Sequence, residues 1–191
     1  MQRYLFIDRD GTLIQSPPPG GQVDTFDKLH FYPFVITWLG RIVRELPYKI
    51  VMVSNQNGLG LPMFPESDFY PTQNFMLAVF KTEGIHFEEI IIDDSLPEEL
   101  SELRKPRIGR MAHYINNLNV DLKNSFVIGD RLTDVQFAKN LGCKAFFLNP
   151  ENTRGVGELT DTVEELKNNW VALASTEWEA IYKYLKNYQP Q

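Results

Sequence analysis

The chain has 191 residues, of which 43% are hydrophobic and 13% aromatic, and this length supports one well-buried domain but is short for two. We therefore expect a single domain over residues 1–191. The formal net charge of −6 disfavours nucleic acid and anionic membranes as partners.

Short runs of branched and aromatic residues alternate with amphipathic stretches along the chain. The runs are typical of strands buried on both faces and lie at 4–7, 50–53, 90–92, 126–128, 145–148 and 170–174. Apolar residues at helical spacing lie at 36–46, 75–80, 111–118, 135–141 and 181–185. This alternation predicts a three-layer α/β/α, Rossmann-like fold with a mostly parallel central sheet and a site at the carboxyl ends of the strands.

Two irregular stretches interrupt the alternation. Residues 17–21, Pro-Pro-Pro-Gly-Gly, cannot be helical and are expected to form a loop or small hairpin over the end of the first strand. Glycines and prolines across 55–71 predict a long loop after the second strand, and such loops are usually functional or mobile. Near the end, Thr176 and Glu179 have the spacing of a capping box, which predicts the start of the last helix.

The remaining composition bears on cofactors and location. Cys143 is the single cysteine, so an intramolecular disulfide and a multi-cysteine zinc site are excluded. Its apolar surroundings favour a packed thiol over a nucleophile. The first residues enter an apolar strand without a basic leader, and no apolar segment is long enough to span a membrane, so we expect a cytoplasmic protein.

The first strand ends in a pair of carboxylates, within Phe6-Ile7-Asp8-Arg9-Asp10-Gly11-Thr12-Leu13. Because side chains alternate along a strand, Asp8 and Asp10 can leave the same side of the backbone. One carboxylate can attack phosphorus or bind a metal while the other handles a proton, provided that a cation limits their repulsion. Taken alone, the pattern fits a strand that ends in an Asp-Gly turn about as well.

Polar groups also follow the second strand and precede a predicted helix. Ser54 and Asn55 offer a hydroxyl and amide donors that can hold phosphate oxygens, although a polar turn has the same composition. Lys105 precedes Pro106, which we expect to begin the helix at 111–118. An ammonium at that place suits an anion, and the alternative is a solvated surface lysine.

The fourth strand runs into Gly129-Asp130-Arg131-Leu132-Thr133-Asp134. It delivers a carboxylate at Asp130, with Asp134 one helical turn further on. Alone, Asp134 would be a first-turn acid that interacts with a helix dipole. Jointly, the strand ends carry the groups that phosphoryl transfer uses, together with one cation.

In this order, the motifs resemble those of the haloacid dehalogenase superfamily of phosphatases over almost the whole chain, and they imply that fold. They are Asp8-Arg9-Asp10-Gly11-Thr12, Ser54-Asn55, Lys105 and Gly129-Asp130-Arg131-Leu132-Thr133-Asp134. Within the superfamily, residues 6–14, 22–24, 54–60 and 104–106 are similar to the histidinol-phosphate phosphatase domain of bifunctional histidine-biosynthesis proteins. The resemblance implies hydrolysis of histidinol phosphate.

The resemblance also implies a role for each motif residue. Asp8 would attack phosphorus and form an aspartyl-phosphate, and Asp10 would protonate the leaving alcohol and later take a proton from water. Mg²⁺ would be held by the carboxylates of Asp8 and Asp130 and by the backbone carbonyl of Asp10. Asp134 would orient the surroundings of the metal without being a direct ligand. The groups that would hold the phosphoryl oxygens are Ser54, Asn55 and Lys105.

The chain departs from this family in the loops. Relatives often carry zinc ligands just before Arg-Lys-Pro, whereas residues 93–103 contain no cysteine or histidine, so structural zinc is not expected. The acids of this loop fit a solvated surface better than a hard-metal site. Residues 15–18 lack the acid that some relatives place there, and Asp24 and Asp27 are either its substitutes or plain surface charges.

The motif spacing leaves no room for a separate cap domain, so we expect an open site. Loops 17–27 and 59–69 would then set specificity, with Phe26, Phe64 and Phe69 as ring contacts or, equally, as loop anchors. The fused half of the family is not found in this chain, which makes a fused or separate imidazoleglycerol-phosphate dehydratase an expected partner.

Other functions compete with a histidinol-phosphate phosphatase. A sugar-phosphate phosphatase of the heptose-bisphosphate type has similar motifs and also lacks a cap. The 3′-phosphatases of nucleic-acid ends share the motifs, but the net charge of −6 disfavours them. A non-catalytic phosphate-binding domain is the alternative from another class. In each enzymatic case the substrate is a phosphorylated molecule.

Overall fold

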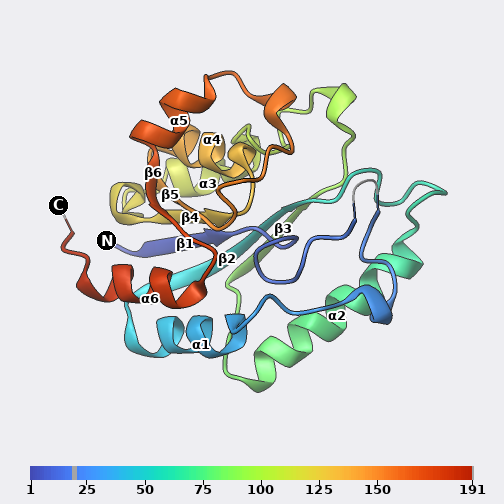
Figure 1. Ribbon diagram of the computed structural model, residues 1–191, viewed down its shortest axis with the longest axis horizontal. Coiled ribbons are helices and arrows are strands. Elements are labelled where there is room, and N and C mark those ends of the chain that lie inside the picture. The colour runs from blue at the N-terminus through green and yellow to red at the C-terminus, as the bar shows by residue number, and fades with distance from the viewer. Residues whose placement is uncertain (19–20, 191) are drawn as a thin grey trace.

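A central sheet covered by helices on both faces forms the framework of the computed structural model, which describes residues 1–18 and 21–190 (Figure 1). The six-stranded sheet has the order β3-β2-β1-β4-β5-β6, and each neighbouring pair is parallel. The strands are β1 (Arg3–Ile7), β2 (Tyr48–Asn55), β3 (Glu89–Asp93), β4 (Phe126–Gly129), β5 (Lys144–Phe147) and β6 (Val171–Ala174). The predicted α/β/α architecture is confirmed.

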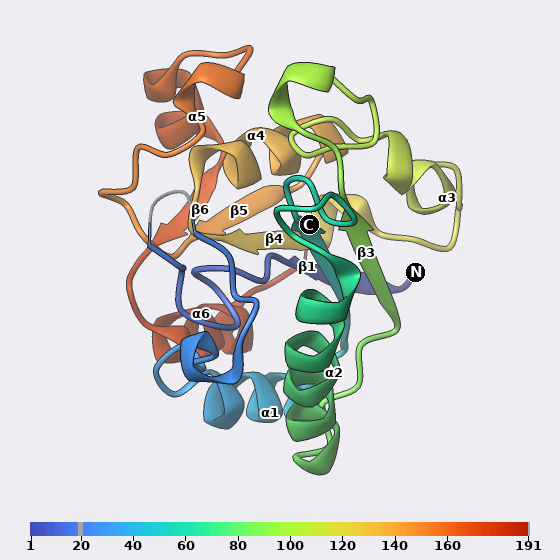
Figure 2. The ribbon, with the colours of Figure 1, turned by 90° about the vertical axis from the view of Figure 1, so that its right-hand side faces the viewer.

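The helices divide between the two faces of the sheet. They are α1 (Val35–Glu45), α2 (Glu66–Thr82), α3 (Ala112–Ile115), α4 (Leu132–Leu141), α5 (Val163–Asn169) and α6 (Trp178–Asn187). Helices α1, α2 and α6 cover one face, and α3, α4 and α5 cover the other (Figures 1 and 2). Because β1 leads outward to β2 and β3 while β4 returns to its other side, β1 and β4 flank the switch point at which such sheets bind ligands.

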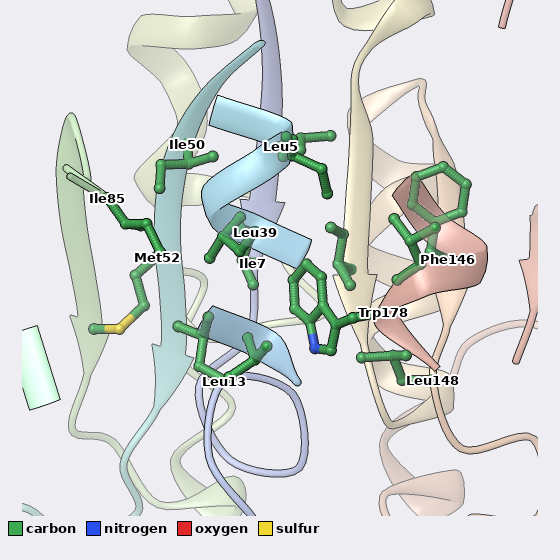
Figure 3. Packing of buried hydrophobic residues seen from close by; sticks show 14 of the residues in the cluster. Leu5, Ile7, Leu13, Leu39, Ile50, Met52, Ile85, Phe146, Leu148 and Trp178 are labelled. Carbon is green, nitrogen blue, oxygen red and sulfur yellow. The ribbon is translucent and has the colours of Figure 1, made fainter. Parts of the chain in front are cut away.

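Both faces of the sheet are apolar because successive side chains of each strand enter different cores. In β1, Leu5 and Ile7 join the core beneath α1 and α6, whereas Tyr4 and Phe6 join the core beneath α4. Trp178 of α6 lies in the middle of the first core (Figure 3). Its indole Nε1 donates to the backbone oxygen of Thr12 at 3.0 Å, which ties the last helix to the turn after β1.

The two predicted irregular stretches, 55–71 and 17–21, agree with the structure only in part. The loop after β2 ends earlier than residue 71, because α2 begins at Glu66 and includes Pro71. Complete burial of Phe69 and Phe80 on the same helix outweighs the cost of the internal proline. Within 17–21, the residues on either side form irregular chain as predicted, whereas residues 19–20 lie outside the described residues.

Pro106 does not begin a helix, contrary to the prediction. Residues 104–107 instead form a turn in which the N–H of Arg107 donates to the carbonyl of Arg104 at 2.8 Å. A 3₁₀ turn at Gly109–Met111 leads into α3, which ends at Ile115. The predicted extension to residue 118 is wrong because Leu118 is 92% exposed and has no apolar face to join.

The C-terminal helices were also predicted incompletely. The residue that caps α6 is Glu177, whose N–H donates to the hydroxyl of Ser175 at 3.0 Å, so the predicted capping box of Thr176 and Glu179 is wrong. Helix α5 was not predicted, because Leu166 is its one buried residue and gives no apolar period. No helix among residues 1–18 and 21–190 is long and apolar enough to cross a membrane.

We predict that Trp178→Ala lowers the free energy of unfolding by about 3 to 5 kcal/mol, because it opens a cavity and leaves the carbonyl of Thr12 without its donor. Urea denaturation at constant pH measures this change. Leu118→Ala, at an exposed position, is the matched control and should change stability by less than about 0.5 kcal/mol. Equal stabilities of the two variants would contradict the role assigned to Trp178.

Candidate active site

Three buried carboxylates meet at the carboxyl ends of β1 and β4. The N–H of Asp8 donates to the carbonyl of Ile128 at 2.9 Å, so Asp8 leaves β1 beside the strand that delivers Asp130. One oxygen of Asp8, one of Asp130 and one of Asp134 all lie within 4.8 Å of one another. The register of two neighbouring parallel strands therefore brings together the first and last predicted motifs.

Glycines make this close approach possible. A Cβ on Gly11, whose φ is +84°, would lie 2.3 Å from Oδ2 of Asp130. A Cβ on Gly129 would lie 2.3 Å from Oδ2 of Asp134. Any side chain at either position would displace a carboxylate of the cluster, so the glycines of both motifs are required by space.

Lys105 is the cation of this cluster. Its Nζ lies 2.8 Å from Oδ1 of Asp8 and 2.7 Å from Oδ1 of Asp134, and the side chain is buried. Burial opposes the charged form, but the carboxylates of Asp134 and Asp8 raise the pKa of Lys105 above its usual value. Lys105 is thus a charged ammonium inside the site rather than a solvated surface lysine.

The carboxyl group of Asp130 has a strongly raised pKa. Burial, followed by repulsion from Asp8 and Asp134, raises the pKa of Asp130 to about 7. Its Oδ2 accepts from the amide of Asn152 at 2.8 Å and from the hydroxyl of Ser16 at 3.3 Å. Its Oδ1 is buried, lies 3.8 Å from Nε of Arg131, and accepts no hydrogen bond from the residues that the structure describes.

The donor set fits a magnesium ion. Buried polar atoms are normally partnered, so the Oδ1 of Asp130, which accepts no hydrogen bond from the described residues and lies 3.8 Å from Nε of Arg131, is suited to a cation. Mg²⁺ binds oxygen ligands and keeps several waters, and an all-carboxylate group meets that preference.

Asp134 belongs to the same group, with Oδ1 bonded to Lys105 and Oδ2 accepting the N–H of Arg131 at 3.2 Å. The prediction that Asp134 orients the surroundings of the metal without binding it directly stays a prediction.

Asp10 is not among the carboxylates grouped with Asp130, and its two oxygens are instead bonded by Arg9 and Gln56. Oδ1 accepts from Nη1 of Arg9 at 2.6 Å, and Oδ2 accepts from Nε2 of Gln56 at 2.8 Å. Arg9 is fully buried, donates from Nε to Oε1 of Gln73 at 2.9 Å, and lies over the ring of Phe69. The position of Arg9 between two acids in the sequence could have indicated its role. Gln73 belongs to a helix distant in sequence, so no local pattern indicates its contact with Arg9.

Ser54 and Asn55 occupy different positions around the site. Ser54 is buried and its hydroxyl accepts from Nε2 of Gln56 at 2.8 Å. The side-chain amide of Asn55 pairs with the main chain of Lys105, donating to its carbonyl at 2.9 Å and accepting its N–H at 3.1 Å. Asn55 therefore holds the segment that presents the ammonium. Direct contact of Ser54 and Asn55 with phosphate stays a prediction.

A small hollow over the cluster shares Asp10, Asn55 and Arg131 with a larger neighbouring cavity. The hollow is lined by Asp8, Asp10, Asn55, Lys105, Arg131, Thr133 and Asp134. The cavity, of about 470 Å³, is lined by Asp10, Pro17, Pro18, Gly21, Gln22, Asn55, Asn57, Arg131 and Arg154. Part of the predicted specificity loop 17–27 lies here, but Arg131 and Arg154 were not predicted as lining residues.

Of the three aromatic residues predicted as ring contacts or loop anchors, Phe64 and Phe69 are buried, as anchors would be, whereas Phe26 is largely exposed. Phe64 and Phe69 are buried and contact each other edge to face at 5.7 Å between ring centres. Phe26 is 59% exposed and lies against Phe75. In the acidic loop 93–103, Asp93 is buried and accepts hydrogen bonds from Ser95.

Comparison with known proteins agrees with this geometry. Residues 102–169 match the model of the HAD-hydrolase-like family. The histidine biosynthesis bifunctional protein HisB of Bacteroides fragilis is 46% identical over 185 residues, covering 96% of this chain and 47% of that protein. HisB of Spirosoma linguale is 43% identical over 188 residues, covering 97% of this chain and 49% of that protein. The chain thus spans about half the length of these relatives.

Among solved structures, D,D-heptose 1,7-bisphosphate phosphatase from B. bronchiseptica, complexed with magnesium and phosphate, has a TM-score of 0.77 at 20% identity. The match covers 97% of this chain and 98% of that one, and it concerns the fold. Fold, site and relatives together show that the chain belongs to the haloacid dehalogenase superfamily of hydrolases. Within that superfamily, the chain is similar to the HisB proteins, at 43% and 46% identity.

We predict that Asp130→Asn stabilises the metal-free protein at pH 8 by about 1 to 3 kcal/mol, because it removes a buried charge from the cluster. The raised pKa of Asp130 sets the pH dependence: the folded wild type loses stability as the pH rises from about 4 to about 7. The advantage of the variant should therefore shrink as the pH falls through that window.

Urea denaturation in EDTA, repeated across this pH range, measures the difference. Mg²⁺ should raise the stability of the wild type and leave Asp130→Asn unchanged. Asp94→Asn, which alters an exposed carboxylate, is the control and should respond to Mg²⁺ as the wild type does. An Asp130→Asn protein less stable than the wild type at pH 8 would refute the repulsion.

Proposed function

We propose that the chain is a cytoplasmic, magnesium-dependent phosphomonoester hydrolase that acts on histidinol phosphate in histidine biosynthesis. The observation that carries this proposal is the position of the Lys105 ammonium between Asp8 and Asp134, two of the three carboxylates that also include Asp130. A nucleophile, an anion-binding cation and a set of hard-metal ligands thus share one buried cluster. The HisB relatives support histidinol phosphate as the substrate.

In the proposed first step, a carboxylate oxygen of Asp8 attacks phosphorus as the bond from phosphorus to the ester oxygen breaks. Asp10 gives its proton to the departing alkoxide, so an alcohol leaves and an aspartyl-phosphate remains. In the second step, water attacks this phosphorus while Asp10 takes its proton. Inorganic phosphate then leaves and the carboxylate of Asp8 is restored.

The surrounding residues hold these groups in place. Arg9 and Gln56 each donate to one oxygen of Asp10, which fixes the carboxyl between the hollow and the cavity. Lys105 supplies positive charge to the phosphoryl oxygens, where stabilisation of charge provides most of the catalysis. Asp8, Asp130 and the carbonyl of Asp10 would hold Mg²⁺, whose charge would offset that of the phosphoryl group and orient it.

A heptose-bisphosphate type of phosphatase is the second candidate, and one observation favours it. Arg131 and Arg154 line the cavity that would receive the leaving group, and their positive charges suit a second anionic group. The solved structure with the similar fold is such a phosphatase. The greater sequence similarity to the HisB proteins favours histidinol phosphate.

The proposed partner is an imidazoleglycerol-phosphate dehydratase. The chain spans about half the length of relatives that are named bifunctional, so a second activity resides in the remainder of those proteins or is shared between the halves. In the proposal, this dehydratase is either fused to the phosphatase or a separate chain.

A panel of phosphate esters with Mg²⁺ tests the proposed function. We expect kcat/KM for histidinol phosphate to exceed that for D,D-heptose 1,7-bisphosphate by at least about tenfold. Asp8→Asn, which is nearly isosteric, should retain its fold and lose turnover by at least about 10³-fold. EDTA should abolish activity, and Mg²⁺ should restore it.

Each other result has a definite meaning. Preference for the bisphosphate would replace histidinol phosphate by the second candidate. Phosphate binding without turnover of any ester, while a reference phosphatase is active in the same assay, would establish a non-catalytic phosphate-binding domain. Full activity in EDTA would refute magnesium dependence.

A further inference from the structure

Arg104, next to Lys105, is a buried arginine that touches no group of the proposed reaction. It is 2% exposed, and its Nε donates to Oε2 of Glu158 at 3.1 Å. Its Nη1 donates to Oδ1 of Asn57 at 2.8 Å and to the carbonyl of Ser95 at 3.2 Å. One guanidinium thus connects segments that are far apart in the sequence.

These partners lie in the loops that surround the site. Asn57 follows β2, Ser95 follows β3, and Glu158 belongs to a 3₁₀ turn between β5 and α5. The beginning of the loop that carries Lys105 is also fixed, because buried Asp93 accepts the N–H of Ser95 at 3.1 Å and lies 3.4 Å from Nε of Arg110. Charged hydrogen bonds therefore hold both ends of residues 93–104.

Stability alone is a weak reason to bury this guanidinium. Removing its charge from water is costly, and its carboxylate partner, Glu158, keeps 28% of its side chain exposed. The planar guanidinium does, however, match acceptors in several directions, which a lysine cannot do. The specific benefit is therefore geometric: the main chain at residue 104 has one position relative to β2 and β3.

That position decides whether Lys105 reaches its partners. The ammonium lies 2.8 Å from Asp8 and 2.7 Å from Asp134, so a displacement of about 1 Å would break both contacts. Asn55 at the end of β2 fixes the main chain of Lys105, and Arg104 fixes the preceding residue through Asn57, Ser95 and Glu158. The two anchors constrain the same peptide.

We propose that Arg104 is a positioning residue, which holds the loop 93–104 so that the ammonium of Lys105 stays between Asp8 and Asp134. The proposal rests on the proposed function in one respect, since that function gives Lys105 its role in turnover. In its structural part, the proposal concerns the loop alone and can be tested in the absence of activity.

Hydrogen exchange followed by mass spectrometry tests the structural part. Arg104→Met should speed exchange of amides within 94–105 by at least about tenfold, while the strands keep their protection. Arg107→Met is the matched control, because the side chain of Arg107 lies in the same segment but is 34% exposed, and its contacts with Glu102 at 3.7 Å and with the carbonyl of Ser101 at 3.5 Å are long. The control should leave exchange unchanged. Equal exchange in wild type and Arg104→Met would overturn the proposal whether or not the protein turns over.

A double-mutant cycle then asks whether Arg104 acts through Lys105. Arg104→Met should lower kcat by about 10- to 100-fold in the wild type, but by less than about threefold in Lys105→Ala, where there is no ammonium to position. A residue that only supports the fold would cause the same loss in both backgrounds, and that result would overturn the proposal. Arg107→Met should change kcat by less than about twofold in either background.

Two further arms keep the test decisive. If Arg104→Met does not fold, Glu158→Gln takes its place and should give the same pattern with a smaller loss, about three- to tenfold. If the wild type turns over no ester, the proposed function fails, and the affinity for inorganic phosphate in the presence of Mg²⁺ replaces kcat in the cycle. Additive losses of phosphate affinity would still overturn the role of Arg104.

Discussion

Repulsion among buried carboxylates is the constraint on which the rest of this structure depends. Oxygens of Asp8, Asp130 and Asp134 lie within 4.8 Å of one another, and two unit charges at that distance repel by about 3 kcal/mol at an effective dielectric constant of about 20. The ammonium of Lys105 offsets part of this repulsion, while burial first, and then the charges of Asp8 and Asp134, raise the pKa of Asp130 to about 7. A divalent cation would neutralise more of this negative charge, and carboxylate oxygens are suitable ligands for it.

The fold brings the opposing charges together from distant parts of the chain. The carboxylates come from β1, β4 and the first turn of α4, on either side of the switch point of the sheet. Lys105 comes from a loop with little regular structure, which is fixed by side chains rather than by its own backbone ladder. Asn55 and Arg104 provide these fixed points, and a third buried cation, Arg9, holds Asp10 in the same way. The proposed catalytic groups Lys105 and Asp10 are thus positioned by buried polar contacts.

The sequence predicted what is set by local periodicity. Strand alternation placed Asp8 and Asp130 at strand ends, and the parallel sheet brought those ends together. Contacts between distant segments could not be read in this way: neither the bond from Gln73 to Arg9 nor the pairing of Asn55 with the main chain of Lys105 leaves a local pattern. Pro71 suggested a loop because the burial that keeps α2 helical is a tertiary effect.

The central claim is that Asp8, the carboxylate paired with Lys105 at the end of β1, becomes covalently phosphorylated. Quenching steady-state turnover of histidinol phosphate with sodium borohydride tests it most directly, because an aspartyl-phosphate is reduced to homoserine and can be located by mass spectrometry of peptides. The account predicts homoserine at position 8 only when substrate and Mg²⁺ are both present. Turnover without homoserine at that position, or with homoserine at position 10 or 130 instead, would contradict it.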